Sequence, residues 1–236
     1  MKKVENGTLN LPVNILETSD ITKIYPILGT DGFYALKNVE IKVPKKSLTI
    51  LKGRSGSGKT TLINILGALD LPTKGTVCLD GEDITKLSEK RREKIRRCEI
   101  GFIFQSVSLI PMMTAYENVE FALRLAGIKE NHKNRVETCL KMVGLESRMH
   151  HMPGELSGGE QQRVAVARAV AHKPKIIFAD EPTAELDTAS SVMVVNLFKE
   201  MVEKEGVTII MTTHDSSLMG AGDYLFELED GEIVHE

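Results

Sequence analysis

A glycine-rich stretch at residues 53–60, GRSGSGKT, restricts the possible folds of this chain more than any other segment. The apolar run before it, at residues 47–52, is typical of a β-strand, and residues 59–69 have the apolar spacing of a helix. Glycines allow such a loop to curl until its backbone N–H groups point at phosphate oxygens, and the helix N-terminus adds partial positive charge. The sequence therefore predicts a strand, a phosphate-binding loop and a helix in succession.

Side chains in and beside this loop have expected roles in binding a nucleotide. We expect Lys59 to reach the β- and γ-phosphates and the Thr60 hydroxyl to bind Mg²⁺. The other expected nucleotide-binding residues are Gly53, Arg54, Ser55, Gly56, Ser57, Gly58 and Thr61. The loop by itself does not decide which kind of nucleotide-using protein this is.

A pair of acids follows a second apolar run, in the sequence IIFADE at residues 176–181. Acids in this place lie at the carboxyl edge of a sheet, where ligands bind in α/β folds. We expect Asp180 to hold Mg²⁺ through water and Glu181 to orient and polarise an attacking water molecule. Phosphoryl transfer asks the protein mainly for positioning and charge neutralisation, so one acid for each task is sufficient.

Apolar runs that alternate with helical segments predict an α/β fold. The runs at residues 175–180 and 207–212 are near-continuous and of strand length, which predicts a sheet buried on both faces. We expect residues 1–13 to form a polar extension and residues 14–236 a single domain, with a mostly helical insert at about residues 86–160. The expected strands span residues 33–43, 47–52, 75–79, 99–104, 175–180 and 207–212. The expected helices span residues 59–69, 86–97, 115–127, 131–143, 160–172 and 188–204.

The composition gives no support for some classes of partner. A net charge of −3, from 30 Lys and Arg against 33 Asp and Glu, gives no overall attraction to nucleic acid, and we expect no nucleic-acid partner. No run approaches the roughly 18 apolar residues of a transmembrane helix. The N-terminus also lacks an apolar stretch long enough for a signal peptide. We therefore expect a cytoplasmic protein with reduced cysteines.

Residues 156–162, LSGGEQQ, resemble the signature motif of the ATPase subunits of ABC transporters, and the order of the motifs fits this family over about residues 14–235. The resemblance implies the ABC ATPase fold: a phosphate-loop core with a mixed sheet, an antiparallel β subdomain and a helical insert. It implies ATP and Mg²⁺ as cofactors. It also implies that Gln105 is the Q-loop glutamine, which binds the metal and acts in catalysis, and that His214 is the catalytic switch histidine.

In this family two subunits pack head to tail, and each ATP lies between the phosphate loop of one and the signature motif of the other. The resemblance implies that Tyr25 stacks on adenine, with Tyr34 as a rival. The residues implied to act across the homodimer are Ser157, Gly158, Gly159, Glu160 and Asp187. Glu160 departs from the family pattern, which usually has Gln, and Asp187 ends an AELD sequence where SALD or GNLD is commoner.

Residues 101–123 are most similar to a group that includes macrolide exporters, lipoprotein-release ATPases and a cell-division ATPase. This implies a subunit on the inner face of the cell membrane that drives a separate integral membrane permease, in efflux or extrusion of an antimicrobial peptide, a drug or a lipoprotein. The alternative is a non-transport ATPase whose membrane partner regulates cell-wall enzymes. An apolar cluster fits either the core of the insert or a socket for a permease helix. Its members are Leu109, Ile110, Met112 and Met113.

Overall fold

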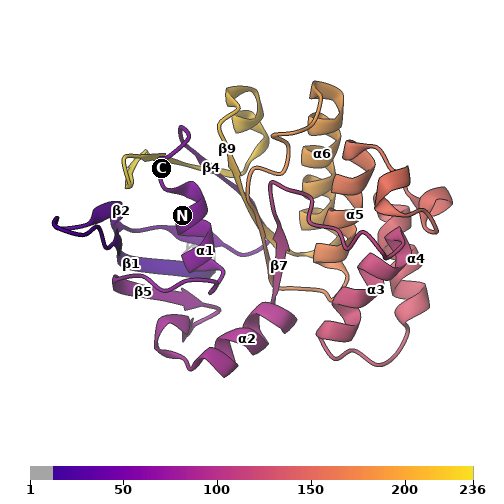
Figure 1. The fold of residues 1–236 in the computed structure, drawn as a ribbon, viewed down its shortest axis with the longest axis horizontal. Helices are drawn as coiled ribbons and strands as arrows, with labels where there is room; N and C mark the ends of the chain where they lie inside the picture. Colours follow the sequence, from indigo (N-terminus) through magenta and orange to yellow (C-terminus); the bar gives the residue numbers. More distant parts are fainter. Residues whose placement is uncertain (1–12, 236) are drawn as a thin grey trace, which may run out of the picture.

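Two β-sheets and six α-helices build the fold that the computed structural model describes for residues 13–235 (Figure 1). The helices are α1 (Lys59–Leu66), α2 (Glu89–Cys98), α3 (Ala115–Leu125), α4 (His132–Met142), α5 (Gly158–Val170) and α6 (Thr188–Glu205). The polar extension expected at residues 1–13 lies, apart from Val13, outside the described residues. Within the described part of the chain, no helix combines the length and the apolar content that crossing a membrane requires.

The central sheet has six strands in the order β11-β10-β4-β9-β8-β7. Its strands are β4 (Leu48–Lys52), β7 (Ile100–Ile103), β8 (Ile176–Ala179), β9 (Thr208–Thr213), β10 (Tyr224–Glu229) and β11 (Glu232–His235). Neighbouring strands are parallel, except that β10 and β11 form an antiparallel hairpin at one edge. The sheet is therefore mixed, as the family resemblance implied, and the phosphate loop follows β4.

The side chains of β8 alternate between two hydrophobic clusters on opposite faces of the central sheet. Ile176 and Phe178 pack with α1 and the antiparallel sheet, whereas Ile177 and Ala179 pack with α3, α4, α5 and α6. All four side chains are fully buried. The prediction of a sheet covered on both faces is confirmed, and this double burial is the reason for the continuous apolar run.

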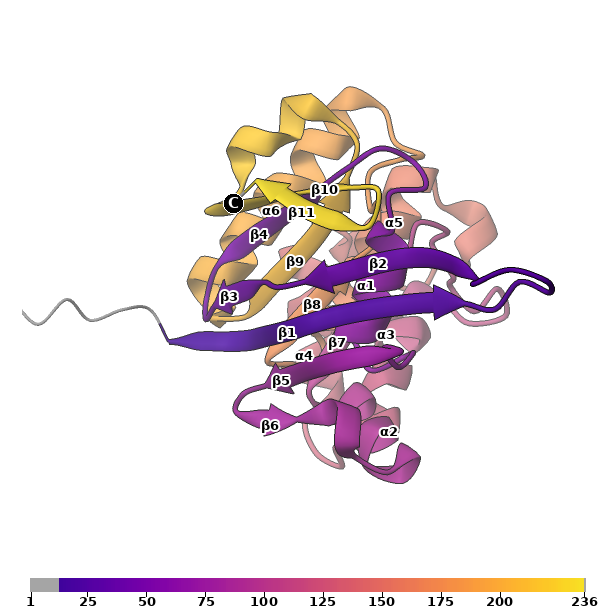
Figure 2. The same cartoon turned by 90° about the vertical axis from the view of Figure 1, so that its left-hand side faces the viewer.

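The second sheet is antiparallel and has β1 (Asn14–Tyr25) in its middle (Figure 2). One side of β1 pairs with β2 (Phe33–Val39) and β3 (Lys42–Pro44), and the other side pairs with β5 (Lys74–Leu79). A tight turn then leads from β5 to β6 (Glu82–Asp83). This sheet covers α1 on the side away from the central sheet, so both sheets contribute to one core around α1.

The strand predicted at residues 33–43 is divided into β2 and β3. Asn38, near the end of β2, has a positive φ of 48°, which bends the chain before β3. The Thr18 hydroxyl on β1 bridges the gap, because it donates to the Val39 carbonyl oxygen at 3.2 Å and accepts from the Ile41 N–H at 2.8 Å. This side chain adds to the backbone bond that the Thr18 N–H donates to the Ile41 carbonyl oxygen at 3.0 Å.

Two helices begin two or more residues away from the predicted start. The helix predicted at residues 160–172 already begins at Gly158, because the Ser157 side chain caps its N-terminus. The charged helix predicted at residues 86–97 begins only at Glu89. A short 3₁₀ turn over Ile84–Lys86 precedes it, and extended backbone at Leu87 separates the two.

Candidate active site

The loop at residues 53–58 joins β4 to α1 and is held by close backbone contacts. A Cβ atom on Gly53 would lie 2.4 Å from the carbonyl oxygen of Leu228 on β10. Gly58 has φ 106°, and a Cβ atom there would lie 2.5 Å from the carbonyl oxygen of Ala35 on β2. Glycine is therefore required at both positions, and the packing fixes the curled shape that directs backbone N–H groups to one place.

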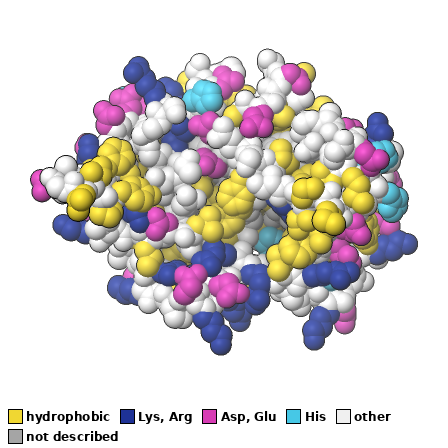
Figure 3. All heavy atoms as spheres, viewed as in Figure 1, with side chains coloured by type: hydrophobic (Ala, Val, Ile, Leu, Met, Phe, Trp, Pro, Cys, Tyr) yellow, Lys and Arg dark blue, Asp and Glu magenta, His cyan; other side chains and the backbone are white. Residues whose placement is uncertain are grey.

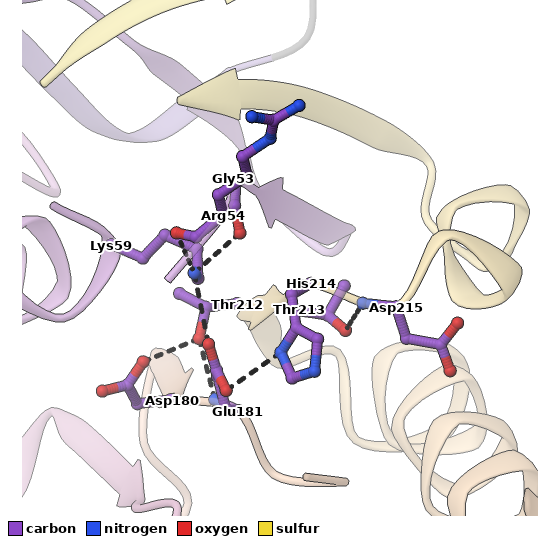
Figure 4. Close-up of polar contacts among 9 residues, drawn as sticks. All are labelled: Gly53, Arg54, Lys59, Asp180, Glu181, Thr212, Thr213, His214 and Asp215. Carbon is purple, nitrogen blue, oxygen red and sulfur yellow. Dashed lines mark hydrogen bonds and ion pairs between the residues drawn. The ribbon is translucent and has the colours of Figure 1, made fainter. Parts of the chain in front are cut away.

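Lys59 stands in the first turn of α1 with its side chain only 4% exposed. Its Nζ atom donates to the carbonyl oxygens of Gly53 at 2.8 Å and Arg54 at 3.0 Å. The same atom lies 3.2 Å from Oε1 of Glu181 (Figure 4). The lysine is thus fixed under the loop, and its charge faces the acids at the end of β8.

The other predicted residues of the loop lie around this lysine. Arg54, Ser55 and Gly56 form the exposed outer part of the loop. Ser57 is buried, and its hydroxyl has no hydrogen-bond partner among residues 13–235. Thr60 lies in the first turn of α1, is exposed and precedes the half-buried Thr61.

One hydroxyl from β9 holds both acids. The Thr212 Oγ1 atom donates to Oδ1 of Asp180 at 2.7 Å, and it accepts the backbone N–H of Glu181 at 2.7 Å (Figure 4). Thr212 is fully buried, and Glu181 has an unusual φ of 45°. Thr212 was not among the residues that the sequence patterns predicted for the site. Its polar side chain in the apolar run at residues 207–212 was the signal that could have identified it.

His214 follows β9 and completes the contacts around Glu181. Its Nδ1 atom lies 3.2 Å from Oε2 of Glu181, while Lys59 faces the other carboxylate oxygen (Figure 4). The sequence singled out these three residues separately, and the structure brings them together from three elements. A carboxylate fixed from two sides beside a phosphate loop can orient a water molecule for attack on a phosphate.

Tyr25 and Gln105 lie at the ends of strands, outside this group of contacts. Tyr25 is the last residue of β1, its side chain is exposed, and the Nζ atom of Lys23 lies 5.1 Å from the centre of its ring. Tyr34, on the neighbouring strand β2, is equally exposed, so exposure does not separate the two tyrosines. Gln105 is exposed and lies two residues beyond the end of β7.

The signature motif forms the N-terminus of α5. Ser157 accepts the N–H of Glu160 at 3.3 Å, and Glu160 Oε2 accepts the N–H of Ser157 at 2.8 Å, which is a capping box. A Cβ atom on Gly159 would lie 3.2 Å from Oγ of Ser190 in the first turn of α6. Among the described residues, no hydrogen bond or ion pair joins this motif to the phosphate loop of the same chain.

Asp187 caps the N-terminus of α6, which lies beside the signature motif. One carboxylate oxygen accepts the backbone N–H of Ser190 at 2.9 Å, and the other accepts its hydroxyl at 2.7 Å. These hydrogen bonds lower the pKa of Asp187. The residues predicted to act across a dimer therefore lie together on two neighbouring helix N-termini.

The apolar cluster after Gln105 divides between core and surface. Leu109 packs against the core, whereas the side chain of Met112 is 88% exposed. The buried Asn118 side chain holds this loop, because it bonds the backbone at Ile110, Met113 and Thr114. Figure 3 shows hydrophobic side chains gathered on this face, over the loop that leads from β7 to α3.

A half-buried arginine on α5 holds the earlier part of the same loop. The guanidinium of Arg168 donates to the carbonyl oxygens of Ser108 at 2.7 Å and Val107 at 3.4 Å. Burial lowers the pKa of this guanidinium. The sequence analysis missed Arg168 and Asn118, because each acts on backbone groups of a segment that no pattern connects to it.

Comparison with known proteins identifies the family of the chain. A sequence profile of the family described as "ABC transporter" matches residues 36–184. An uncharacterized ABC transporter ATP-binding protein of Methanocaldococcus jannaschii, MJ0796, is 43% identical over 227 residues, which are 94% of this chain and 96% of that protein. The macrolide export ATP-binding/permease protein MacB of Syntrophobacter fumaroxidans is 42% identical over 227 residues, covering 95% of this chain but 32% of that protein.

A solved structure has the same fold. It is the dimeric post-hydrolysis state of the ATP-binding cassette MJ0796 with ADP and Pi, and it superposes with a TM-score of 0.86 at 40% identity over 93% of this chain and 97% of that one. The profile covers more than half of the chain, and the identities extend over nearly all of it. The chain therefore belongs to the ABC transporter family, as an ATP-binding protein with the family's ATPase domain.

Proposed function

We propose that two copies of this chain form the ATP-hydrolysing part of a membrane machine, and that ATP binding joins the copies while hydrolysis separates them. The observation that supports this most directly is the contact of Glu181 with both Lys59 and His214 at the edge of the phosphate loop. A merely structural ion pair needs only one partner. A carboxylate held on both oxygens next to a phosphate loop is suited to chemistry on a phosphate.

The residues present fit a Mg²⁺ ion bound together with ATP. Mg²⁺ prefers oxygen ligands and usually takes only one or two from the protein, with the rest from water and phosphates. The Thr60 hydroxyl and the Gln105 side-chain oxygen would supply these two, and the Asp180 carboxylate would hold the ion through water. When bound, the ion neutralises charge on the phosphates. Thr212 keeps Asp180 in place for this task through its 2.7 Å hydrogen bond.

Glu181 is proposed to orient the attacking water and to accept its proton. Its backbone is fixed by the Thr212 hydroxyl, and His214 contacts its side chain. His214 then keeps the carboxylate directed at the water when the γ-phosphate draws Lys59 to itself. Tyr25 is proposed to stack on adenine because of the family resemblance, and its place at the end of β1 leaves its ring accessible.

The second half of each site is proposed to come from the partner copy, in a head-to-tail homodimer. Two observations support this: the relative MJ0796 is a dimer with ADP and Pi, and the signature motif makes no bond to its own phosphate loop within the described residues. Ser157, Gly158, Gly159, Glu160 and Asp187 would then face the partner's nucleotide. We expect Ser157→Arg to prevent ATP-driven dimerisation, because the long cation fills this contact; a variant that still dimerises in light scattering would contradict the shared site.

The membrane partner is proposed to dock on the loop between β7 and α3. Met113, Phe121 and Leu125 line a hollow of about 420 Å³ beside the exposed Met112. The relative MacB is named as an ATP-binding and permease protein, which supports a permease as the membrane partner of this ATP-binding protein. We place the pair on the inner face of the cell membrane and propose efflux or extrusion of a drug, an antimicrobial peptide or a lipoprotein. The alternative partner is one that regulates cell-wall enzymes.

Glu181→Gln is the experiment that tests the proposed chemistry. We expect ATP binding, measured by calorimetry, to persist and steady-state phosphate release to fall at least about 10³-fold, because the water loses its base. The control is Glu200→Gln, an exposed acid on α6 whose one partner within residues 13–235 is Lys204. Retained hydrolysis in Glu181→Gln would refute the role of Glu181.

The same variant tests the membrane partner. Tagged Glu181→Gln protein, held closed by ATP, is used to purify its partner from solubilised membranes of the native host. A permease with few membrane spans and a large outer domain would support extrusion or regulation of cell-wall enzymes, and the type of that domain would distinguish them. A permease with many spans and a binding protein would show an importer instead.

A further inference from the structure

Glu160 places a negative charge at the point where the signature motif is proposed to meet the partner's nucleotide. Its carboxylate does not extend outward from the N-terminus of α5. One oxygen accepts the Ser157 N–H at 2.8 Å, and the other lies 3.5 Å from Nε of Arg148. The backbone N–H of Ser157 and the charges of Arg148 and Arg163 lower the pKa of Glu160, so the group stays ionised.

Arg148 comes from a separate element, the short 3₁₀ helix Glu146–Arg148. Its guanidinium lies close to the Glu160 side chain, which is 21% exposed, and also 3.1 Å from Nε2 of His151. Arg163, the other cation near Glu160, donates to the sulfur of Met193 on α6 at 3.4 Å. Arg148 is therefore the cation that pairs directly with Glu160 among the described residues.

We propose that Arg148 is a positioning residue of the signature motif, which neutralises Glu160 and keeps its carboxylate turned back onto Ser157. The inference rests on the proposed function, because it matters only if the motif approaches a partner's phosphates. Two like charges at a half-buried contact repel strongly, since water screens them less than in bulk. Without Arg148, the free carboxylate would oppose the triphosphate and leave the capping box disordered.

The proposed role of Arg148 depends on the charge of residue 160. The need for Arg148 exists only while residue 160 carries a charge. With Gln at position 160, the amide oxygen still accepts the Ser157 N–H of the capping box, and no charge remains to be neutralised. The effects of changing Arg148 and Glu160 should therefore be strongly non-additive, as expected for two groups in direct contact.

The test is a double-mutant cycle in full-length protein that carries Glu181→Gln, so that ATP stays bound. The measured quantity is the dissociation constant of the ATP-bound dimer, from sedimentation velocity. We expect Arg148→Ala to weaken the dimer about tenfold, or ~1.4 kcal/mol. In the Glu160→Gln background the same Arg148→Ala change should alter the dissociation constant by no more than about twofold, because no charge is left to neutralise.

Two further measurements separate charge from mere structure. The loss in Arg148→Ala should shrink as salt rises from 0.05 to 0.5 M, because salt screens exposed charges. Arg148→Lys should keep most of the affinity. The matched control is Arg97→Ala, which removes a similarly exposed arginine from its pair with Glu93 on α2 and should leave the dimer unchanged.

The outcomes decide between the two proposals. Unchanged dimerisation of Arg148→Ala, or a loss that Glu160→Gln does not rescue, overturns the role of Arg148 while the proposed function stands. A loss without rescue would mean that Arg148 contacts the nucleotide or supports the fold. If the Glu181→Gln parent itself fails to dimerise with ATP, the shared site fails and this inference fails with it.

Discussion

Replacing Thr212 with valine removes the one hydroxyl that holds both acids of the site. The side chain keeps its shape, but Asp180 loses a donor at 2.7 Å and the backbone N–H of Glu181 loses its acceptor at 2.7 Å. A hydrogen bond to a charged group contributes ~1.5–3 kcal/mol, and a buried N–H without a partner costs ~1–3 kcal/mol. We therefore expect Thr212→Val to lower the free energy of unfolding by about 3 kcal/mol.

The chain offers a matched control on the adjacent strand. Thr49 on β4 is also fully buried, and its hydroxyl has no hydrogen-bond partner among the residues that the structure describes. Thr49→Val is the same chemical change without lost bonds, so it should be neutral or stabilising. Urea unfolding gives both free energies, and a loss of 3 kcal/mol should also lower Tm by about 6–12 °C for a chain of this size.

The two threonine variants should also differ in ATP hydrolysis. Asp180 and Glu181 are free to move in Thr212→Val, so ATP hydrolysis should fall about 10-fold or more while it stays normal in Thr49→Val. Equal stability losses in the two variants, within about 0.5 kcal/mol, would refute the reasoning, because shape rather than hydrogen bonding would then dominate. Normal hydrolysis in a destabilised Thr212→Val would show that the hydroxyl serves the fold alone.

Three further predictions concern other parts of the fold. Hydrogen bonds from Lys175 and a second lysine lower the pKa of Asp80 to about 2, so its carboxylate adds stability above pH 3.8 that is lost as the pH falls towards 2. Asp80→Asn should thus lower Tm at pH 7. A difference in Tm between the variant and the unchanged protein that does not shrink as the pH falls towards 2 would contradict this. Asn118→Ala should cost ~2–3 kcal/mol and speed hydrogen exchange in the loop before α3, whereas unchanged exchange would exclude a holding role. Gly101→Ala should cost ~1–3 kcal/mol in thermal unfolding, because its Cβ would lie 2.5 Å from a backbone oxygen of α5, whereas Gly154→Ala, which meets nothing within 4 Å, should be near neutral.

Local patterns were sufficient to predict the helices and most strands of the central sheet, but not β1 or the hairpin of β10 and β11. The run at residues 175–180 is apolar because both faces of β8 are covered. A loop of the GRSGSGKT type predicts a strand directly before it and a helix directly after it. Such signals depend on residues close in the chain. The contact of Lys59 with Glu181 was not predicted, although a phosphate loop and acids after a parallel strand share one edge of a sheet.

These local patterns could not predict contacts between segments that are distant in the sequence. The role of Thr212 depends on the register of β8 and β9, which no local signal sets. Thr18, on β1, bridges the gap between β2 and β3 with its hydroxyl, and β1 precedes both strands in the chain. Arg168 donates to the loop at Ser108 across the helical layer. In each case a polar side chain serves a partner that is near only after folding.

The place of β4 in the central sheet has a consequence for how the protein is made. Leu48 pairs with Ile209 of β9, and Thr49 pairs with Tyr224 of β10. The strand that leads into the phosphate loop therefore leaves the ribosome well before both of its neighbours. Such distant pairings form slowly, and synthesis adds only about 5–20 residues per second. For several seconds β4 is thus an apolar strand without its neighbours, and the sheet around the phosphate loop can form only after β9 and β10 have been synthesised.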